Sequence, residues 1–170
     1  MSKSLGFTIS ELVTVIAICS IIAYLALPYL NDIMISNEVN QLKRTLTIHI
    51  QKAKSDAQIH HKNVTLCASS DSISCHNDWN KGFIGFIDNN RNRQRESTET
   101  LLYVNSFNHR YGILGWRGTL HINSLTFQGD TGLPRGSNGS FFYCMNNSNH
   151  HTQVILSNMG QIRSQEISSC

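Results

Sequence analysis

Glu11 poses the clearest chemical question in the sequence, because it is a lone carboxylate at the start of an apolar run from Leu12 to Leu30. At about 1.5 Å per residue, a helix over Thr8–Leu27 would span roughly 30 Å, the thickness of one hydrocarbon core. An unpaired charge at the edge of that core costs a few kcal/mol or more, so Glu11 needs a partner. The sequence therefore predicts a membrane-spanning helix with one charge to satisfy.

Two partners for Glu11 remain open. In a capping box, Thr8 caps the helix and Glu11, three residues later, reaches back to the first free amides. Alternatively, cleavage after Gly6 would make Phe7 a new N-terminus, and its amine would pair with Glu11 of a neighbouring subunit. The two interactions can coexist, and the second would make assembly the condition for satisfying both charges in lipid.

A second candidate is a group of basic residues, Arg91, Arg93 and Arg95, that alternate within one loop. Alternate spacing would place three guanidinium groups on one side of an extended strand, where they would meet DNA phosphates with an affinity that falls with salt. The alternative is a solvated hairpin in which Glu96 and Glu99 offset part of the charge. We favour the hairpin, since a net charge of +3 does not by itself indicate a nucleic-acid partner.

Signals for catalysis or metal binding are weak. Neither G-x-S-x-G nor H-E-x-x-H occurs. The adjacent pairs His60-His61 and His150-His151 do not share a helix or strand face, so we interpret them as solvated helix-end or loop residues. Asp88-Asn89-Asn90 begins like a calcium loop, but Arg91 and Arg93 follow where an EF-hand has acceptors and a glycine, which favours a turn. We therefore predict neither an enzyme, nor a metal site, nor a cofactor.

The elements that position these residues begin with a helix that continues beyond the apolar run. Apolar residues recur at steps of three and four to about His60, the pattern of an amphipathic helix with one stripe on a core. No clear turn signal intervenes, so we expect one long helix that is bent or loosened at Pro28. The stripe consists of Val39, Leu42, Leu46, Ile50, Ala53 and Ala57.

After His61 the pattern changes to short runs typical of β-strands, separated by loops rich in turn residues. The fold class predicted is α+β, a long N-terminal membrane and stem helix followed by an antiparallel β-sheet domain. Asn158-Met159-Gly160 is expected to form a hairpin turn. The strands expected are Val64–Ala68, Phe83–Asp88, Thr100–Val104, Leu120–Phe127, Ser140–Met145, Gln153–Ser157 and Gln161–Ser164.

These residues resemble a known family. A leader that ends in Gly6, then Phe7-Thr8, Glu11 and an apolar helix, is similar to the type III signal of type IV pilins and type II secretion pseudopilins. The β part resembles the GspH/FimT domain, and the likeness then covers nearly the whole chain. The motifs of the β part are weak individually, and the likeness to the GspH/FimT domain depends on their order and spacing. The motifs are Val64-Thr65-Leu66-Cys67, Cys75 with Trp79, Gly82-Phe83, Phe86 and Asp88, Glu99-Thr100-Leu101-Leu102, Leu125-Thr126-Phe127 with Gly129 and Gly132, and Ile155-Leu156-Ser157 with Gly160 and Arg163.

The resemblance implies a minor pilin or pseudopilin, a structural subunit of a type IV pilus or a type II secretion pseudopilus. It implies cleavage after Gly6 by prepilin peptidase, N-methylation of Phe7, and assembly through Glu11 and Pro28 with other major and minor pilins or pseudopilins. The protein would be a single-pass inner-membrane protein with its C-terminal domain in the periplasm. Its parts would be a leader (1–6), a membrane and filament-core helix (7–30), an amphipathic stem helix (31–61) and a periplasmic β domain (62–170).

A periplasmic location makes disulfides the first interpretation of four of the five cysteines. Four cysteines allow three connectivities. Cys67 and Cys75 are close in sequence and bracket a polar loop, which leaves Cys144 to pair with Cys170 at the end of the chain. The absence of C-x-x-C argues against zinc, and Cys19 falls in the membrane helix as a small apolar residue.

DNA-binding members of the family suggest an alternative function, a DNA receptor for natural transformation. In those members the closing motif is Gly-Arg-x-Arg. Here it reads Gly160-Gln161-Ile162-Arg163, so half of the motif's charge is missing. We therefore predict at most weak DNA binding by Arg91, Arg93, Arg95 and Arg163.

Overall fold

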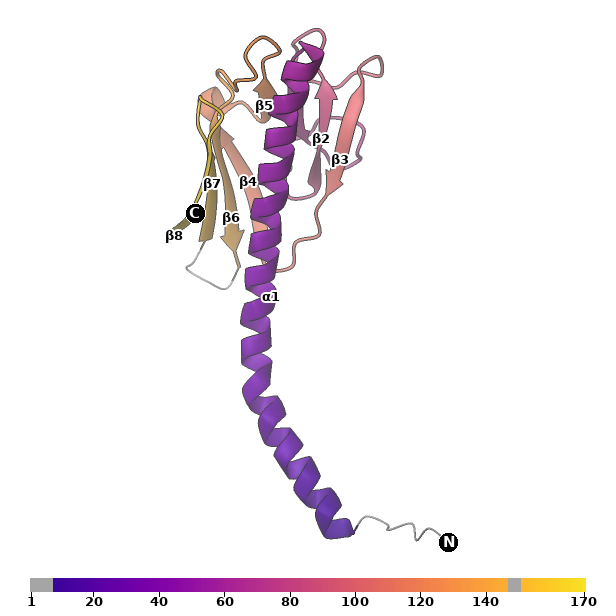
Figure 1. The fold of residues 1–170 in the computed structure, drawn as a ribbon, viewed down its shortest axis with the longest axis vertical. Coiled ribbons are helices and arrows are strands. Elements are labelled where there is room, and N and C mark those ends of the chain that lie inside the picture. The colour runs from indigo at the N-terminus through magenta and orange to yellow at the C-terminus, as the bar shows by residue number, and fades with distance from the viewer. Residues whose placement is uncertain (1–7, 147–150) are drawn as a thin grey trace. The chain divides into compact units, whose positions relative to one another are not determined.

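The computed structural model describes residues 8–146 and 151–170, and for residues 27 and 28 only the backbone. It contains one long helix followed by antiparallel strands, as predicted (Figure 1). The chain divides into two compact units, with the boundary between Glu38 and Val39. The elements are α1 (Ile9–His60), β1 (Val64–Ala68), β2 (Gly82–Ile87), β3 (Leu101–Ser106), β4 (Gly112–Gly118), the 3-10 turn η1 (Thr119–His121), β5 (Ser124–Phe127), β6 (Gly139–Met145), β7 (His151–Leu156) and β8 (Ile162–Ile167).

In the first unit, nearly all the apolar side chains of α1 that the structure describes are exposed. By length and composition the helix contains a stretch that could cross a membrane, with a mean hydropathy of 2.2 and none of it buried within the protein. α1 runs without a break through Pro28 to His60, which confirms the prediction of one long helix, and the loosening expected at Pro28 stays a prediction. An apolar helix that is not buried within the protein agrees with a membrane anchor, because a lipid bilayer would surround its side chains.

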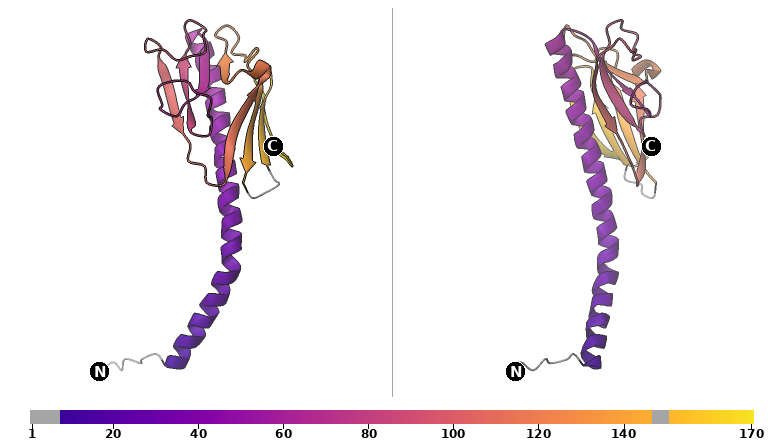
Figure 2. Two further views of the ribbon diagram at one scale, coloured as in Figure 1. Left: turned by 180° about the vertical axis from the view of Figure 1, so that it is seen from behind. Right: turned by 90° about the vertical axis from the view of Figure 1, so that its right-hand side faces the viewer.

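In the second unit, the predicted stripe from Val39 to Ala57 is buried, each of its six residues in one hydrophobic core. That core joins α1 to two four-stranded antiparallel sheets, ordered β3-β2-β1-β5 and β4-β6-β7-β8. Figures 1 and 2 show this half of α1 running along both sheets. His49 of α1 packs edge-on against Phe83 of β2, with ring centroids 5.0 Å apart.

The strand predictions miss one strand and make another too long. β4 was not predicted, because its glycines at 112, 115 and 118 look like loop residues, although its side chains alternate between buried and exposed. The strand expected over Leu120–Phe127 is shorter, since Leu120 and His121 have positive φ values of 58° and 59° and form η1. Only Ser124–Phe127 joins a sheet, as β5.

The histidine pairs differ from one another. His60 closes α1 and His61 follows it, both exposed as expected. His151 is not a loop residue, because it begins β7 and its ring Nδ1 accepts a hydrogen bond from the Met145 amide at 3.0 Å. His150 and most of the loop predicted at 146–150 lie outside the described residues.

Both predicted disulfides are present. Cys67–Cys75 closes a loop with a sequence separation of 8, and Cys144–Cys170 closes one with a separation of 26. Inside the first loop, the hydroxyl and amide of Ser74 and the amide of Ile73 bind Asp71, and they hold the pKa of that carboxyl well below its usual range. Each disulfide is expected to contribute about 2–4 kcal/mol to the free energy of unfolding.

The hairpin turn predicted at Asn158-Met159-Gly160 connects β7 to β8. The Ser157 amide donates to the Gln161 carbonyl at 3.0 Å, and the Gly160 amide donates to the Ser157 carbonyl at 2.9 Å. Gly160 has φ of 72°, a conformation that glycine adopts without steric cost.

Candidate functional site

The first candidate site is the N-terminus of α1. The Thr8 amide and hydroxyl each donate to Glu11 Oε2 at 2.8 Å, and the Glu11 amide lies 3.4 Å from Thr8 Oγ1. The capping box is therefore formed, which confirms one of the two partners considered for Glu11. The other partner, a neighbour's amine, is not tested by a single chain. Gly6 and Phe7, the predicted cleavage site, lie outside the described residues.

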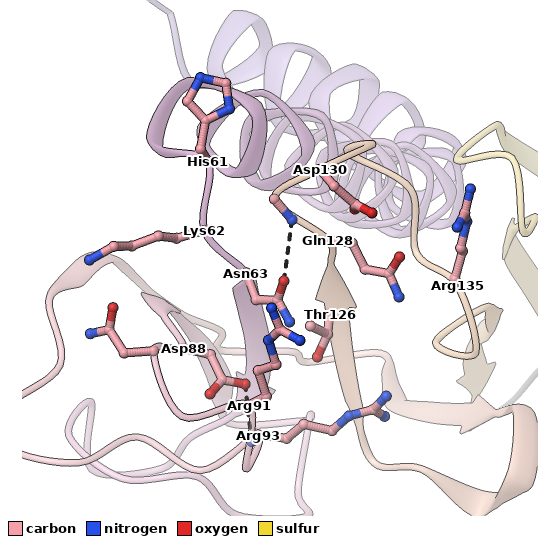
Figure 3. Close-up of a pocket in the computed structure, with 12 residues that line it drawn as sticks. His61, Lys62, Asn63, Asp88, Arg91, Arg93, Thr126, Gln128, Asp130 and Arg135 are labelled. Atoms are coloured by element: carbon pink, nitrogen blue, oxygen red, sulfur yellow. Dashed lines mark hydrogen bonds between the residues drawn. The ribbon is translucent and has the colours of Figure 1, made fainter.

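The second candidate is a polar groove of about 690 Å³ at one end of the first sheet (Figure 3). Its walls carry more cationic than anionic side chains, four Lys or Arg against two Asp. Phosphate or carboxylate groups are the ligands that such a wall attracts. The lining residues are His61, Lys62, Asn63, Asp88, Asn89, Arg91, Arg93, Thr126, Gln128, Gly129, Asp130 and Arg135.

Sheet order explains why residues distant in sequence meet here. β1 pairs with both β2 and β5, and Val64 lies opposite Ile87 on one side and Phe127 on the other. The segment before β1 and the segments after β2 and β5 therefore lie side by side at the same end of the sheet. The Asp88 amide donates to the Asn63 carbonyl at 2.9 Å, and the Gly129 amide donates to Asn63 Oδ1 at 3.2 Å.

A buried polar network lies beneath the groove. Thr65 Oγ1 of β1 donates to Asp88 Oδ2 at 3.1 Å and lies 2.8 Å from Thr126 Oγ1 of β5. All three residues are buried. The network ties β1 to β5 and to the loop after β2, so the groove has a well-defined base.

The predicted basic residues are only partly brought together. Arg91 and Arg93 both line the groove, whereas Arg95 Nη1 donates to the Ile73 carbonyl at 2.7 Å. Arg163 lies on β8 and lines a separate hollow with Lys43. Arg91 and Arg93 have φ values of 61° and 62°, so the extended strand considered for them is wrong and the segment is a folded loop.

The sequence analysis did not predict that three further basic residues, His61, Lys62 and Arg135, line one groove together with Arg91 and Arg93. Arg135 is about seventy residues from Lys62 in sequence, and no local pattern links them. Only the pairing of β1 with β5 brings their segments together. Among residues 8–146 and 151–170, no three His, Cys, Asp or Glu side chains converge on one point.

A helix that packs its second half on antiparallel sheets, with an exposed apolar first half, defines a type IV pilin-like protein, a structural class rather than an enzymatic one. The chain belongs to the family described as type II transport protein GspH, whose model matches residues 44–160. This confirms the resemblance seen in the β motifs.

Solved structures agree on the fold. The chain is similar to a crystal structure of the type IV minor pilin FimU from Pseudomonas aeruginosa strain PAO1, with a TM-score of 0.54 and 19% identity over 79% of this chain and 96% of that one. A second crystal form of FimU gives a TM-score of 0.50 and 17% identity, over 77% and 98% of the two chains. At these identities the likeness is one of fold. No curated protein sequence matches the chain.

Proposed function

We propose that the chain is a minor pilin or pseudopilin, a structural subunit that joins a helical filament through its N-terminal helix. The observation that carries the proposal is that Glu11, in the first turn of an exposed apolar helix, has no charged partner among the described residues. Thr8 uses only Oε2 of Glu11, and among the described residues no basic group pairs with the carboxylate. Membership of the family and the pilin fold support the same role.

The mechanism follows from these parts. The apolar helix holds the subunit in the inner membrane, with the β domain in the periplasm. Prepilin peptidase cleaves after Gly6, which frees the Phe7 amine for methylation. Glu11 then pairs with the amine of a neighbouring subunit and sets its register, because neither charge is stable alone in lipid. Pro28 lets the helix loosen as it passes from lipid into the filament core.

Processing is the first step to test. We expect the mature chain to begin at Phe7 with a methylated amine, because a small residue before an apolar capped helix is what a prepilin junction presents. Mass spectrometry of the chain purified from cells with active prepilin peptidase measures this directly. A mature protein that still begins at Met1 would contradict the proposal, and the same chain from peptidase-deficient cells serves as the unprocessed control.

A second candidate function is DNA binding for natural transformation, and the groove is what favours it. Lys62, Arg91, Arg93 and Arg135 line one groove. Two features oppose strong binding. Asp88 and Asp130 line the same walls, and Arg163, the remaining base of the closing motif, lies elsewhere on β8.

We therefore expect weak, salt-sensitive binding of duplex DNA. A protein that neutralises two to four phosphates has a shallow salt slope, and its dissociation constant should be roughly 10⁻⁵ M or weaker at physiological salt. Titration of labelled duplex with the full chain in detergent micelles, at several salt concentrations, measures both quantities. Sub-micromolar binding that is lost in Arg91→Gln and Arg93→Gln but kept in Arg163→Gln would favour the DNA receptor and place its site in the groove.

A further inference from the structure

Within the loop between β2 and β3, the segment Asp88–Glu99 has the length and oxygen spacing of a calcium loop. It contains 12 residues, with side-chain oxygen donors at its first, third, fifth, ninth and twelfth positions. An EF-hand loop uses these positions together with the backbone carbonyl of the seventh. The donors here are Asp88, Asn90, Asn92, Glu96 and Glu99, with Gln94 at the seventh position.

The backbone removes the objection that the sequence raised. Arg93 occupies the sixth position, where an EF-hand has glycine for a sharp turn. In the structure Arg93 itself adopts the left-handed conformation, with φ of 62°. Its amide donates to Asp88 Oδ2 at 3.1 Å, and the Gln94 amide donates to Asn92 Oδ1 at 2.8 Å. The turn that glycine normally allows is thus formed without it.

Turns of this kind also form without a metal, so the turn alone does not indicate a cation site. The buried carboxylates of the loop do. Asp88 is only 1% exposed, and its Oδ1 atom is buried without a hydrogen-bond partner. The Arg93 amide of the same loop binds the other oxygen, so the carboxylate lies beneath the loop and not out in solvent. A buried carboxylate oxygen without a partner carries a large desolvation cost unless a cation meets it.

Glu99, at the twelfth position, is the second buried carboxylate and is 5% exposed. Its two oxygens accept the amides of Asn89 at 2.8 Å and Glu96 at 3.1 Å, which hold it against the first residues of the loop. Among the residues that the structure describes, no Lys, Arg or His nitrogen forms an ion pair with Asp88 or Glu99. One loop therefore holds two buried carboxylates that pair with no basic side chain in the described part of the chain.

The arginines of the loop do not occupy this role. Arg91 and Arg93 line the groove (Figure 3), and Arg95 is bound to the Ile73 carbonyl. Their three charges still offset those of Asp88, Glu96 and Glu99 at longer range, which lowers the attraction for a divalent cation.

We propose that the Asp88–Glu99 loop binds Ca²⁺, with the unpartnered oxygen of Asp88 as its first ligand. Asn90, Asn92, the Gln94 carbonyl and Glu99 are the further oxygen donors that the spacing supplies. Two carboxylates with neutral oxygens suit Ca²⁺, which accepts six to eight oxygens in flexible geometry, better than Mg²⁺, which demands a near-ideal octahedron. With its charge offset by arginines, the loop is expected to bind weakly, on the order of 10⁻⁴–10⁻³ M, as extracellular modules do.

The test uses the full chain in detergent micelles, stripped with a chelator and titrated with CaCl₂ at constant ionic strength. Isothermal titration measures binding, and the fluorescence of the buried Trp79 and Trp116 follows thermal unfolding. We expect Ca²⁺ to raise the unfolding temperature, because a ligand that binds only the folded state stabilises it. The half-maximal effect should fall on the order of 10⁻⁴–10⁻³ M, and MgCl₂ should be at least about tenfold less effective.

Three variants locate the site. Glu99→Gln should abolish the response to Ca²⁺, and Asn92→Ala should weaken binding about tenfold or more. Asp130→Asn, an acidic residue of the same groove outside the loop, is the matched control and should respond as the wild type does. If Glu99→Gln does not fold, Asn92→Ala decides, because Asn92 is exposed. No response of the wild type at about 10 mM CaCl₂, far above the affinity range of such loops, or equal responses of the wild type and Asn92→Ala, would overturn the proposal.

Discussion

Replacing Glu11 with alanine is expected to leave the subunit in the membrane but to exclude it from filaments. Alanine removes the one charge of an otherwise apolar stretch, so insertion of the helix in lipid becomes easier rather than harder. Assembly loses the carboxylate that would neutralise a neighbour's Phe7 amine, and that amine would stay uncompensated in a low-dielectric surrounding. Membrane fractionation together with analysis of sheared filaments measures the two outcomes separately.

Glu11→Gln distinguishes the two roles of this residue. Glutamine also serves as the last residue of a capping box, so the contact with Thr8 is retained while the charge is lost. If pairing with an amine drives assembly, Glu11→Gln should fail as Glu11→Ala does. Thr8→Ala, which removes the hydroxyl of the cap but keeps the carboxylate, should still assemble. Normal incorporation of Glu11→Gln with failure of Thr8→Ala would show that Glu11 acts only as a cap.

Local sequence patterns predicted much of this fold, because the residues that form each such pattern lie within one helix, strand or turn. The stripe of α1 repeats at helical spacing, and each of its members from Val39 to Ala57 is buried. β1 matches its predicted bounds at Val64–Ala68, since a short run of mostly apolar residues ends there at turn residues, and all five are buried. The hairpin turn at Gly160 likewise depends on one residue that readily takes a positive φ.

The errors arise where a distant partner decides the structure. β4 is held by its pairing with β6 along the whole of Gly112–Gly118, and this partner is what makes a glycine-rich segment a strand. The 3-10 turn at Leu120 shows the opposite case, in which an apolar residue looks like part of a strand but has a left-handed backbone. Strand propensity is weak compared with such tertiary context.

The groove could not be predicted for the same reason. Its basic residues come from the segments that follow α1, β2 and β5, and only the order β2-β1-β5 gathers them. The capping box and the disulfides, by contrast, connect residues whose spacing or chemistry already indicates the contact. Thr8 and Glu11 are three residues apart, and oxidised cysteines can pair only with each other.

Replacing Leu46 with alanine is expected to remove a large share of the stability of the second unit. Leu46 is 2% exposed and lies in the core that joins α1 to both sheets. A buried Leu→Ala change costs about 2–5 kcal/mol, from lost burial and from the cavity left behind. Domains are stable by only about 5–15 kcal/mol, so the midpoint of guanidinium unfolding should fall markedly. The fluorescence of Trp79 and Trp116, both buried in this unit, reports the transition.

Ile48→Ala is the matched control, two residues further along the same helix. Ile48 is 59% exposed, so its truncation removes little buried surface, and alanine has the higher helix propensity. Its free energy of unfolding should stay within about 0.5 kcal/mol of the wild type. Because the two variants share the helix and the type of change, their difference measures how strongly the buried stripe holds α1 to the sheets. Equal destabilisation by Leu46→Ala and Ile48→Ala would mean that the stripe does not hold α1 in solution as the structure shows.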